Sequence, residues 1–299
     1  MKSPFIIIFL CSSFLTQAVV KGEQTRTDLL KNNDQVIHVQ EIYKTVDTCK
    51  LTIHIFYAHH SFERENNTAI VFFHGGGWAF GTPDEFYTTC ERYARMGIVT
   101  YSVEYRLSID RGVTPHTLIS PIESVMDAKS AMRWVRENAG RFHVGKNKIV
   151  AAGQSAGGHL ALCTAMIDDY NEKSDNLRIS CRPDAALLFS SCVNAVEGWC
   201  DRLLAGRRNA IWSISPAHNV KGGLPPMIEF HGEYDDQVPL WTVQFFERAM
   251  NKEGNYFEAH TYKGMRHYLG EGNPKYSRYF DDEILKVADD FLRKFKFLD

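Results

Sequence analysis

Hydrophobic residues along the chain fall into short apolar runs, separated by longer segments in which apolar positions recur at a helical spacing. Short apolar runs bounded by turn residues are typical of strands, and apolar positions three or four apart are typical of amphipathic helices. The pattern therefore predicts strands at 36–44, 51–57, 70–73, 98–103, 149–152, 185–189, 227–230 and 257–262. It predicts helices at 83–96 and 122–140, from 157 onward, and at 284–297.

The order of these elements predicts the fold class. The first two strands alternate enough to form an antiparallel pair, and strands alternate with helices after them. Such alternation indicates an α/β fold, with a mostly parallel sheet covered on both faces by helices. Residues 194–220 break the alternation, and we expect them to form a short lid. Since α/β folds of this length often form one domain, we expect residues 21–299 to form a single domain.

The first twenty residues form a separate unit. Lys2 precedes a short apolar core, too short for a comfortable transmembrane helix and typical of a secretory signal peptide. We expect residues 1–20 to be removed, the mature protein to be secreted, and no stable membrane insertion to remain; an uncleaved anchor is the alternative. A sequon begins at Asn66, which is predicted to be glycosylated in a eukaryotic secretory route.

Composition and charge narrow the choice of partners. Hydrophobic residues make up 44% of the 299 residues, enough for one large core. The chain has 34 Lys and Arg against 36 Asp and Glu, a net charge of −2. Removal of residues 1–20 takes one lysine, so the mature balance is 33 − 36 = −3. Since no basic run is present, we expect no nucleic-acid partner. The sequence carries no signature of an oligomeric state.

Cysteine usage is compatible with export. After removal of Cys11 an even number remains, which permits up to three disulfides in a secreted chain. Cys192 and Cys200 flank the expected lid and are the first pair that we expect to be bonded, whereas Cys163 fits a buried free thiol. Scattered histidines and the absence of a Cys-x-x-Cys spacing predict no metal site. The six remaining cysteines are Cys49, Cys90, Cys163, Cys181, Cys192 and Cys200.

A Gly-x-Ser-x-Gly pentapeptide at residues 153–157 connects a predicted strand to a predicted helix. A serine hydroxyl is a poor nucleophile until a sharp turn holds it beside a base. Both flanking glycines lack a Cβ, so a strained turn can form there and neighbouring chain can pack closely. Ser155 is therefore the candidate nucleophile.

A second motif supplies candidate hydrogen-bond donors. The strand at 70–73 ends in a His-Gly-Gly-Gly-Trp sequence at residues 74–78, which leaves backbone N–H groups uncovered by side chains. Such donors are what a developing oxyanion requires. We expect an oxyanion hole formed by the N–H groups of Gly76 and Gly77, together with Ala156, the residue after the serine.

An acid and a histidine follow the serine in the chain. Asp235 and Asp236 lie in the loop after the strand at 227–230, and His267 follows the strand at 257–262. A carboxylate in that position can orient an imidazole and stabilise it once it is protonated. The order Ser155, Asp235, His267 is the order of a hydrolase triad on an α/β fold. Spacing alone leaves Asp236 as an alternative acid.

The remaining histidines and aromatic residues near these motifs have structural interpretations. His74 is expected to fix the glycine loop by hydrogen bonding and not to act as a base. His159 and His231 are expected to pack in the core. Trp78 and Phe80 either line an acyl pocket or belong to the core.

From residue 36 to the C-terminus the chain resembles the α/β-hydrolase superfamily. Within it, the chain is similar to the His-Gly-Gly-Gly esterases grouped with hormone-sensitive lipase and the feruloyl-esterase-like carboxylesterases. The family acid sits four residues after the strand-end histidine, which implies Asp235. Two departures are Met265 and Arg266, where such families often carry a glycine before the histidine, and a short lid, which speaks against long-chain lipase action. The resemblance rests on residues 74–78, 104–107, 127–128, 134–135, 153–160 and 231–239.

Together with the predicted signal peptide, this resemblance implies a secreted serine carboxylesterase. It would cleave a small-molecule ester with a small to medium acyl group through a Ser-His-Asp triad and an acyl-enzyme intermediate, without a cofactor. Two alternatives remain open. One is an amide hydrolase, either arylformamidase-like or a peptidase, and the other is a non-catalytic binding protein with an α/β-hydrolase fold.

Overall fold

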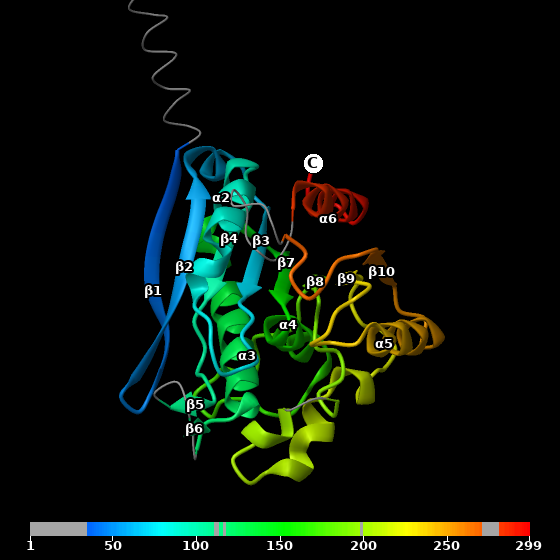
Figure 1. Cartoon of the computed structure of the whole chain (residues 1–299). Coiled ribbons are helices and arrows are strands. Elements are labelled where there is room, and N and C mark those ends of the chain that lie inside the picture. Colours follow the sequence, from blue (N-terminus) through cyan, green and yellow to red (C-terminus); the bar gives the residue numbers. More distant parts are fainter. Residues whose placement is uncertain (1–34, 111–113, 116–117, 198–199, 271–280) are drawn as a thin grey trace, which may run out of the picture.

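The computed structural model describes residues 35–110, 114–115, 118–197, 200–270 and 281–299 (Figure 1). The predicted signal peptide at residues 1–20 lies outside the described residues. Within them, a central eight-stranded sheet carries helices on both faces. None of the helices in these residues is both long and apolar enough to cross a bilayer.

The sheet has the strand order β1-β2-β4-β3-β7-β8-β9-β10. The first two pairings, β1 with β2 and β2 with β4, are antiparallel, and the remaining neighbours run parallel. The predicted α/β class with a mostly parallel sheet is therefore confirmed. The strands are β1 (Val36–Val46), β2 (Cys49–Ala58), β3 (Asn67–Phe73), β4 (Val99–Val103), β7 (Val144–Gln154), β8 (Ala185–Phe189), β9 (Met227–Gly232) and β10 (Phe257–Tyr262).

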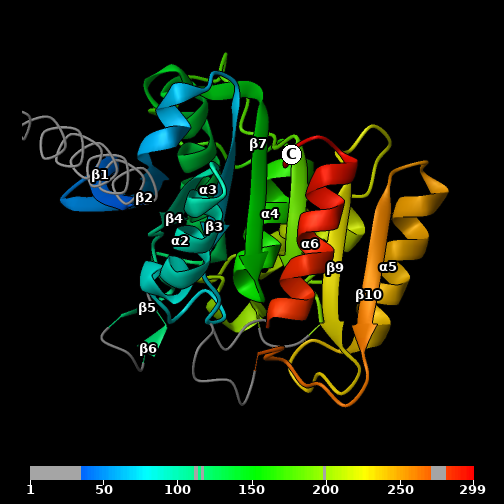
Figure 2. The same cartoon turned by 90° about the horizontal axis from the view of Figure 1, so that it is seen from above.

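Alternation of side chains along β3 divides the core into two layers. Val71 and Phe73 face one layer together with residues of α3, α4 and α5, whereas Ile70 and Phe72 face the other with residues of α2 and α6. Figure 2 shows α2 and α6 on one side of the sheet and α3, α4 and α5 on the other. The helices are α2 (Tyr87–Arg95), α3 (Pro121–Glu137), α4 (Ala156–Met166), α5 (Leu240–Lys252) and α6 (Asp282–Lys294).

Some elements were not predicted. The pattern predicted no helix at α5, and a short pair of strands lies after β4. The expected lid at residues 194–220 contains short 3-10 helices instead of a full α-helix. These further elements are β5 (Ile109–Asp110), β6 (Thr114–Pro115), η1 (His59–Glu63), η2 (Pro83–Phe86), η3 (Ala139–Phe142), η4 (Cys200–Leu203), η5 (Arg208–Ile214) and η6 (Pro216–His218).

A buried ion-pair cluster fixes the segment that follows β4. Asp127 of α3 is fully buried and accepts from Lys44 Nζ at 2.6 Å and from Arg106 Nη2 at 2.7 Å. Its other oxygen accepts from the backbone N–H and Nε of Arg106 at 2.9 and 2.8 Å. Breaking one partner of such a pair leaves a buried charge uncompensated, which is strongly destabilising. Since Tyr105 is next to Arg106, the cluster also fixes a side chain that contacts the glycine loop described below.

Candidate active site

Ser155 lies on a strained turn between the last residue of β7 and the first residue of α4. Its φ of 55° and ψ of −118° are unusual for a residue with a side chain. A Cβ on Gly157 would lie 1.9 Å from the carbonyl oxygen of Phe73, and a Cβ on Gly153 would lie 2.3 Å from that of Gly157. Because neither position has room for a side chain, both glycines of the pentapeptide are required for this turn.

The loop after β9 brings an acid to the histidine. His267 Nδ1 donates to Asp235 Oδ2 at 2.8 Å, and Asp235 Oδ1 accepts the backbone N–H groups of Gln237 and Val238 at 2.9 and 2.8 Å. Burial alone would raise the pKa of Asp235, but the hydrogen bond and charge of His267, the backbone N–H of Val238 and the charge of His231 together hold the pKa below its ordinary value. The Asp236 side chain is 58% exposed. Of the two candidate acids, the structure places Asp235 against the imidazole.

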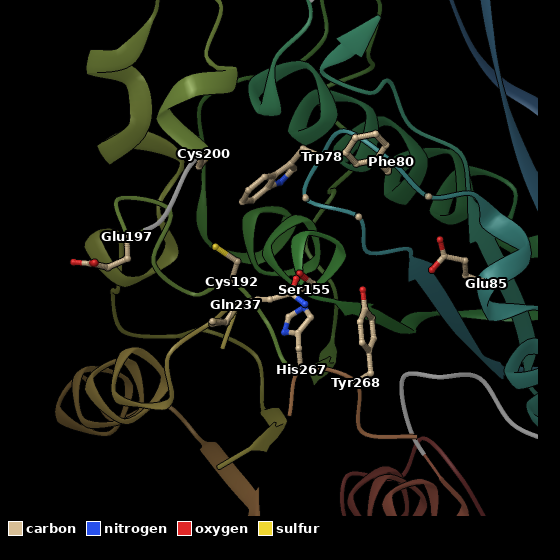
Figure 3. A pocket seen from close by; sticks show the side chains of 14 residues that line it. Trp78, Phe80, Glu85, Ser155, Cys192, Glu197, Cys200, Gln237, His267 and Tyr268 are labelled. Atoms are coloured by element: carbon tan, nitrogen blue, oxygen red, sulfur yellow. The ribbon is translucent and has the colours of Figure 1, made fainter. Parts of the chain in front are cut away.

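The other ring nitrogen of His267 faces Gln154, a contact that sequence reasoning missed. With Nδ1 donating to Asp235, Nε2 is the accepting nitrogen, and Gln154 Nε2 lies 3.1 Å from it. Gln154 is buried, and its Oε1 fills the space that a Cβ on Gly75 would occupy. His267 and Ser155 line the same pocket (Figure 3). Gln154 therefore links the histidine to the glycine loop.

The glycine loop adopts backbone conformations that favour glycine. Gly76 and Gly77 have φ of 102° and 59°. The carbonyl oxygen of Gly76 accepts the N–H groups of Ala79 and Phe80 at 3.1 and 3.0 Å, which closes a tight turn. Both glycines line the pocket with Ser155. Ala156 begins α4, where backbone N–H groups have no intrahelical partner and favour an anion.

His74 contacts the start of this loop, with its Nδ1 2.8 Å from the carbonyl oxygen of Gly75, in agreement with the predicted hydrogen-bonding role. Tyr105 Oη donates to the carbonyl oxygen of His74 at 2.8 Å, and the two rings stack with centroids 4.2 Å apart. Burial lowers the pKa of His74 to about 4, so the ring is neutral at pH 7. His74 and Tyr105 thus hold the start of the glycine loop in place.

His159 connects the loop to the lid. Trp78 Nε1 donates to His159 Nδ1 at 3.1 Å, which leaves His159 Nε2 to donate to the carbonyl oxygen of Ile214 at 2.7 Å. Burial lowers the pKa of His159 to about 4. The predicted packing role for this histidine agrees with its position. Trp78, held by that bond, lines the pocket.

The pocket has a volume of about 360 Å³ and is bordered by the glycine loop, the nucleophile turn, the acid loop and the lid. In Figure 3, Trp78 and Phe80 come from the glycine-loop side and Cys200 from the lid. The residues that line it are Gly76, Gly77, Trp78, Phe80, Gly81, Glu85, Ser155, Cys192, Glu197, Cys200, Gln237, Val238, His267 and Tyr268.

The predicted disulfide between Cys192 and Cys200 is not formed. All six cysteines from Cys49 onward are free thiols, and Cys192 Sγ instead contacts the carbonyl oxygen of Asn194 at 3.7 Å. Burial raises the pKa of Cys192 to about 12 and that of Cys200 well above its ordinary value. A thiol needs its thiolate form to attack, so neither competes with Ser155 as a nucleophile at neutral pH. Cys163 is a buried free thiol, as expected.

His231 is buried, as expected, and its ring lies between Glu229 and the Asp235 loop, contacts that the sequence did not predict. Asn66, the predicted glycosylation site, is exposed at the turn before β3, and its modification stays a prediction. Within the described residues, no group of three or more His, Cys, Asp or Glu side chains is placed to hold a metal ion. The pocket itself is lined by a serine, a histidine and the glycine loop.

Comparison with known families and structures gives a consistent result. The family model BD-FAE matches residues 55–250. Esterase LipC of Mycobacterium tuberculosis is 26% identical over 59% of this chain and 46% of its own length. The acetylxylan esterase of Xylanibacter ruminicola is 26% identical over 77% of this chain and 46% of its own length. The chain thus spans about half the length of these two curated relatives.

Solved structures match over a larger share of both chains than these two curated relatives do. Thermogutta terrifontis esterase 2 phosphoramylated by tabun superposes with a TM-score of 0.78 at 35% identity, covering 87% of this chain and 96% of that chain. The propionate-bound form of the same esterase gives 0.77 at 36% identity, covering 87% and 95%. A butyrate-bound form gives 0.77 at 36% identity, again covering 87% and 95%.

Proposed function

This chain belongs to the BD-FAE family of α/β-hydrolase esterases, and from that premise we propose that it is a serine carboxylesterase acting on short acyl esters. The observation that carries the proposal is the 2.8 Å hydrogen bond between His267 and Asp235, made beside a pocket that holds Ser155. Nucleophile, base and orienting acid are the three parts that acyl transfer by a serine requires.

In the first half-reaction, Ser155 Oγ attacks the ester carbonyl while His267 Nε2 takes its proton. Asp235 keeps the proton on Nδ1 and stabilises the imidazolium that forms. His267 then protonates the leaving alcohol, and an acyl group remains on Ser155. In the second half-reaction, His267 takes a proton from water, which attacks the acyl carbonyl. The bond between Ser155 Oγ and the acyl group then breaks, Ser155 regains its proton from His267, and the acid is released.

The backbone N–H groups of Gly76, Gly77 and Ala156 stabilise the oxyanion of each tetrahedral intermediate. Removing one such donor costs about 3–4 kcal/mol of transition-state stabilisation in serine hydrolases. Their fixed positions matter because donors that are already oriented need no reorganisation when charge develops. The stacked pair of His74 and Tyr105 provides that rigidity.

The size of the pocket supports a preference for small to medium acyl groups. A volume of about 360 Å³ is at the small end of the range typical of ligand pockets. The related esterase has been crystallised with propionate and with butyrate, both short acyl acids. We further propose that the mature protein is secreted after loss of residues 1–20 and is glycosylated at Asn66.

Hydrolysis of a p-nitrophenyl ester series from acetyl to palmitoyl tests this function. We expect kcat/KM to peak at short chains and turnover to vanish in Ser155→Ala. A folded protein that is inactive on every ester would contradict the proposal. It would favour an arylformamidase-like hydrolase or a non-catalytic binding protein. Activity that survives in Ser155→Ala would contradict the mechanism.

A further inference from the structure

A row of buried polar groups extends from Asp235 on the side away from His267. The ring of His231, near the end of β9, has Nε2 2.9 Å from the carbonyl oxygen of Val238 and 3.4 Å from Asp235 Oδ2. Its Nδ1 lies 3.1 Å from Glu229 Oε1. The side chains of His231, Glu229 and Asp235 have no exposed area. The triad mechanism uses neither Glu229 nor His231.

The partners of the His231 ring specify its protons. A backbone carbonyl only accepts, so the nitrogen facing Val238 must carry a hydrogen. A carboxylate also only accepts, so the nitrogen facing Glu229 carries a hydrogen when Glu229 is ionised. Burial alone would lower the pKa of His231, but the hydrogen bond and charge of Glu229, together with the charge of Asp235, hold the pKa above its ordinary value.

The buried carboxylate of Glu229 requires a nearby positive charge, which the His231 ring supplies. Glu229 is fully buried, and among the described residues His231 is the one basic side chain within ion-pair distance of it. A buried carboxylate is tolerated when it is paired and hydrogen-bonded. Its Oε2 has no hydrogen-bond partner in the described part of the chain. The contacts at Oε1 therefore provide all the hydrogen bonds that stabilise the buried carboxylate.

Glu229 also reaches the nucleophile side of the site. The same Oε1 accepts the backbone N–H of Ser191 at 2.8 Å, and the next residue, Cys192, donates its N–H to the carbonyl oxygen of Ser155 at 3.1 Å. One buried pair therefore contacts the loop after β8, which supports the serine turn, and the loop after β9, which carries Asp235. These two loops position the two halves of the triad.

We propose that Glu229 and His231 form a buried ion pair that positions the triad, with His231 held as an imidazolium between Glu229 and the Asp235 loop. His231 is a positioning residue, since it acts through Asp235 and touches no reacting atom. The charged groups that face it are Glu229 on its own strand and Asp235 on the following loop, with His267 beyond Asp235. The catalytic consequence rests on the proposed function, but the ion pair does not.

The first test therefore needs no turnover. In ¹⁵N-histidine-labelled wild-type protein at pH 8, NMR should show one histidine with both ring nitrogens protonated, and that signal should be missing in His231→Gln. His59→Gln, which changes an exposed histidine, is the matched control and should retain the signal. A neutral imidazole signal for His231 at pH 8 would overturn the proposal, whatever the activity of the enzyme.

The second test is a double-mutant cycle on the pH profile of kcat/KM. Without the positive charge beside Asp235, the imidazolium of His267 is more stable, so the acidic limb should move to higher pH by about half a unit or more. Glu229→Gln and His231→Gln should each show this shift, and the double variant should shift no further, because the pair acts as one unit. A merely structural role would lower kcat without moving the limb. An unmoved limb or additive shifts would contradict the proposal.

Discussion

Asp235 Oδ2 accepts the Nδ1–H of His267 across 2.8 Å, although its neighbour in the chain, Asp236, is more than half exposed and makes no such contact. The two carboxylates differ in role because the turn after β9 directs one inward, where two backbone N–H groups hold it. Adjacent acids on a loop are hard to separate by spacing, and here the backbone bonds separate them.

Replacing these acids one at a time should give opposite results. Asp235→Asn should lower kcat about 10⁴-fold, because the amide no longer enforces the tautomer of His267 that accepts from Ser155. Asp236→Asn, the matched control, should leave kcat within about twofold of wild type. Steady-state kinetics on a short p-nitrophenyl ester distinguishes the two. Similar losses in both variants would contradict the assignment of Asp235.

The glycine loop should not tolerate a side chain at Gly76. A Cβ there would lie 2.2 Å from the carbonyl oxygen of Phe80, and the φ of 102° disfavours any residue other than glycine. Because the loop must move, we expect Gly76→Ala to lower kcat by about 10²–10³-fold, the loss typical of one displaced oxyanion donor. Gly254→Ala is the control, since Gly254 has a φ of 75° but no atom within 4 Å of its built Cβ. It should lose some thermal stability and keep kcat. Equal kinetic effects in both variants would refute the role of the loop.

Gln154 should influence the basicity of His267. Gln154→Glu places a carboxylate next to Nε2 of His267, stabilises the imidazolium, and should move the acidic limb of kcat/KM to higher pH by about one unit. Gln154→Met removes a donor that stabilises the neutral ring, so the acidic limb should also move to higher pH, but by less than in Gln154→Glu. A pH series on the three proteins measures both effects. Identical limbs in wild type and Gln154→Glu would show that the 3.1 Å contact is not made in solution.

Two buried histidines should make the protein sensitive to acid. His74 and His159 bind a proton near pH 4 when folded, against an ordinary value of 6.5. The unfolded chain therefore holds more protons between these values, and the free energy of unfolding should fall as pH drops from about 6.5 to about 4. Each histidine accounts for about 2–4 kcal/mol of this loss. Urea unfolding across that range should show a flatter pH dependence in His159→Gln than in His59→Gln. Equal slopes would mean that His159 is not buried as a neutral ring.

The sequence predicted the features that depend on local pattern. Each of the eight expected strands is present in the sheet, because apolar runs and the turn residues that bound them are local features of the sequence. The glycine spacing around Ser155 identified the strained turn, since only glycine fits the two flanking positions. The helix at Leu240–Lys252 was missed, although Val243, Phe246 and Met250 are buried at helical spacing.

Contacts between distant segments were not predictable in the same way. In the sequence His231 lies at the end of an apolar strand. Its contact with Val238 depends on the path of the loop that follows. Gln154 reaches His267 only because β7 and the loop after β10 converge at one edge of the sheet. The prediction of a Cys192–Cys200 disulfide was wrong, because the number and order of cysteines do not determine the distance and orientation of their thiols.

The central claim is that Ser155 is a nucleophile activated by His267, and covalent labelling tests it most directly. The related esterase from Thermogutta terrifontis has been crystallised phosphorylated by paraoxon. After incubation of this protein with paraoxon, peptide mass spectrometry should find one diethylphosphoryl group, on Ser155, in proportion to the activity lost. Ser155→Ala and His267→Gln should take up no label under the same conditions. A label on another residue, or full inactivation with Ser155 unmodified, would contradict the account.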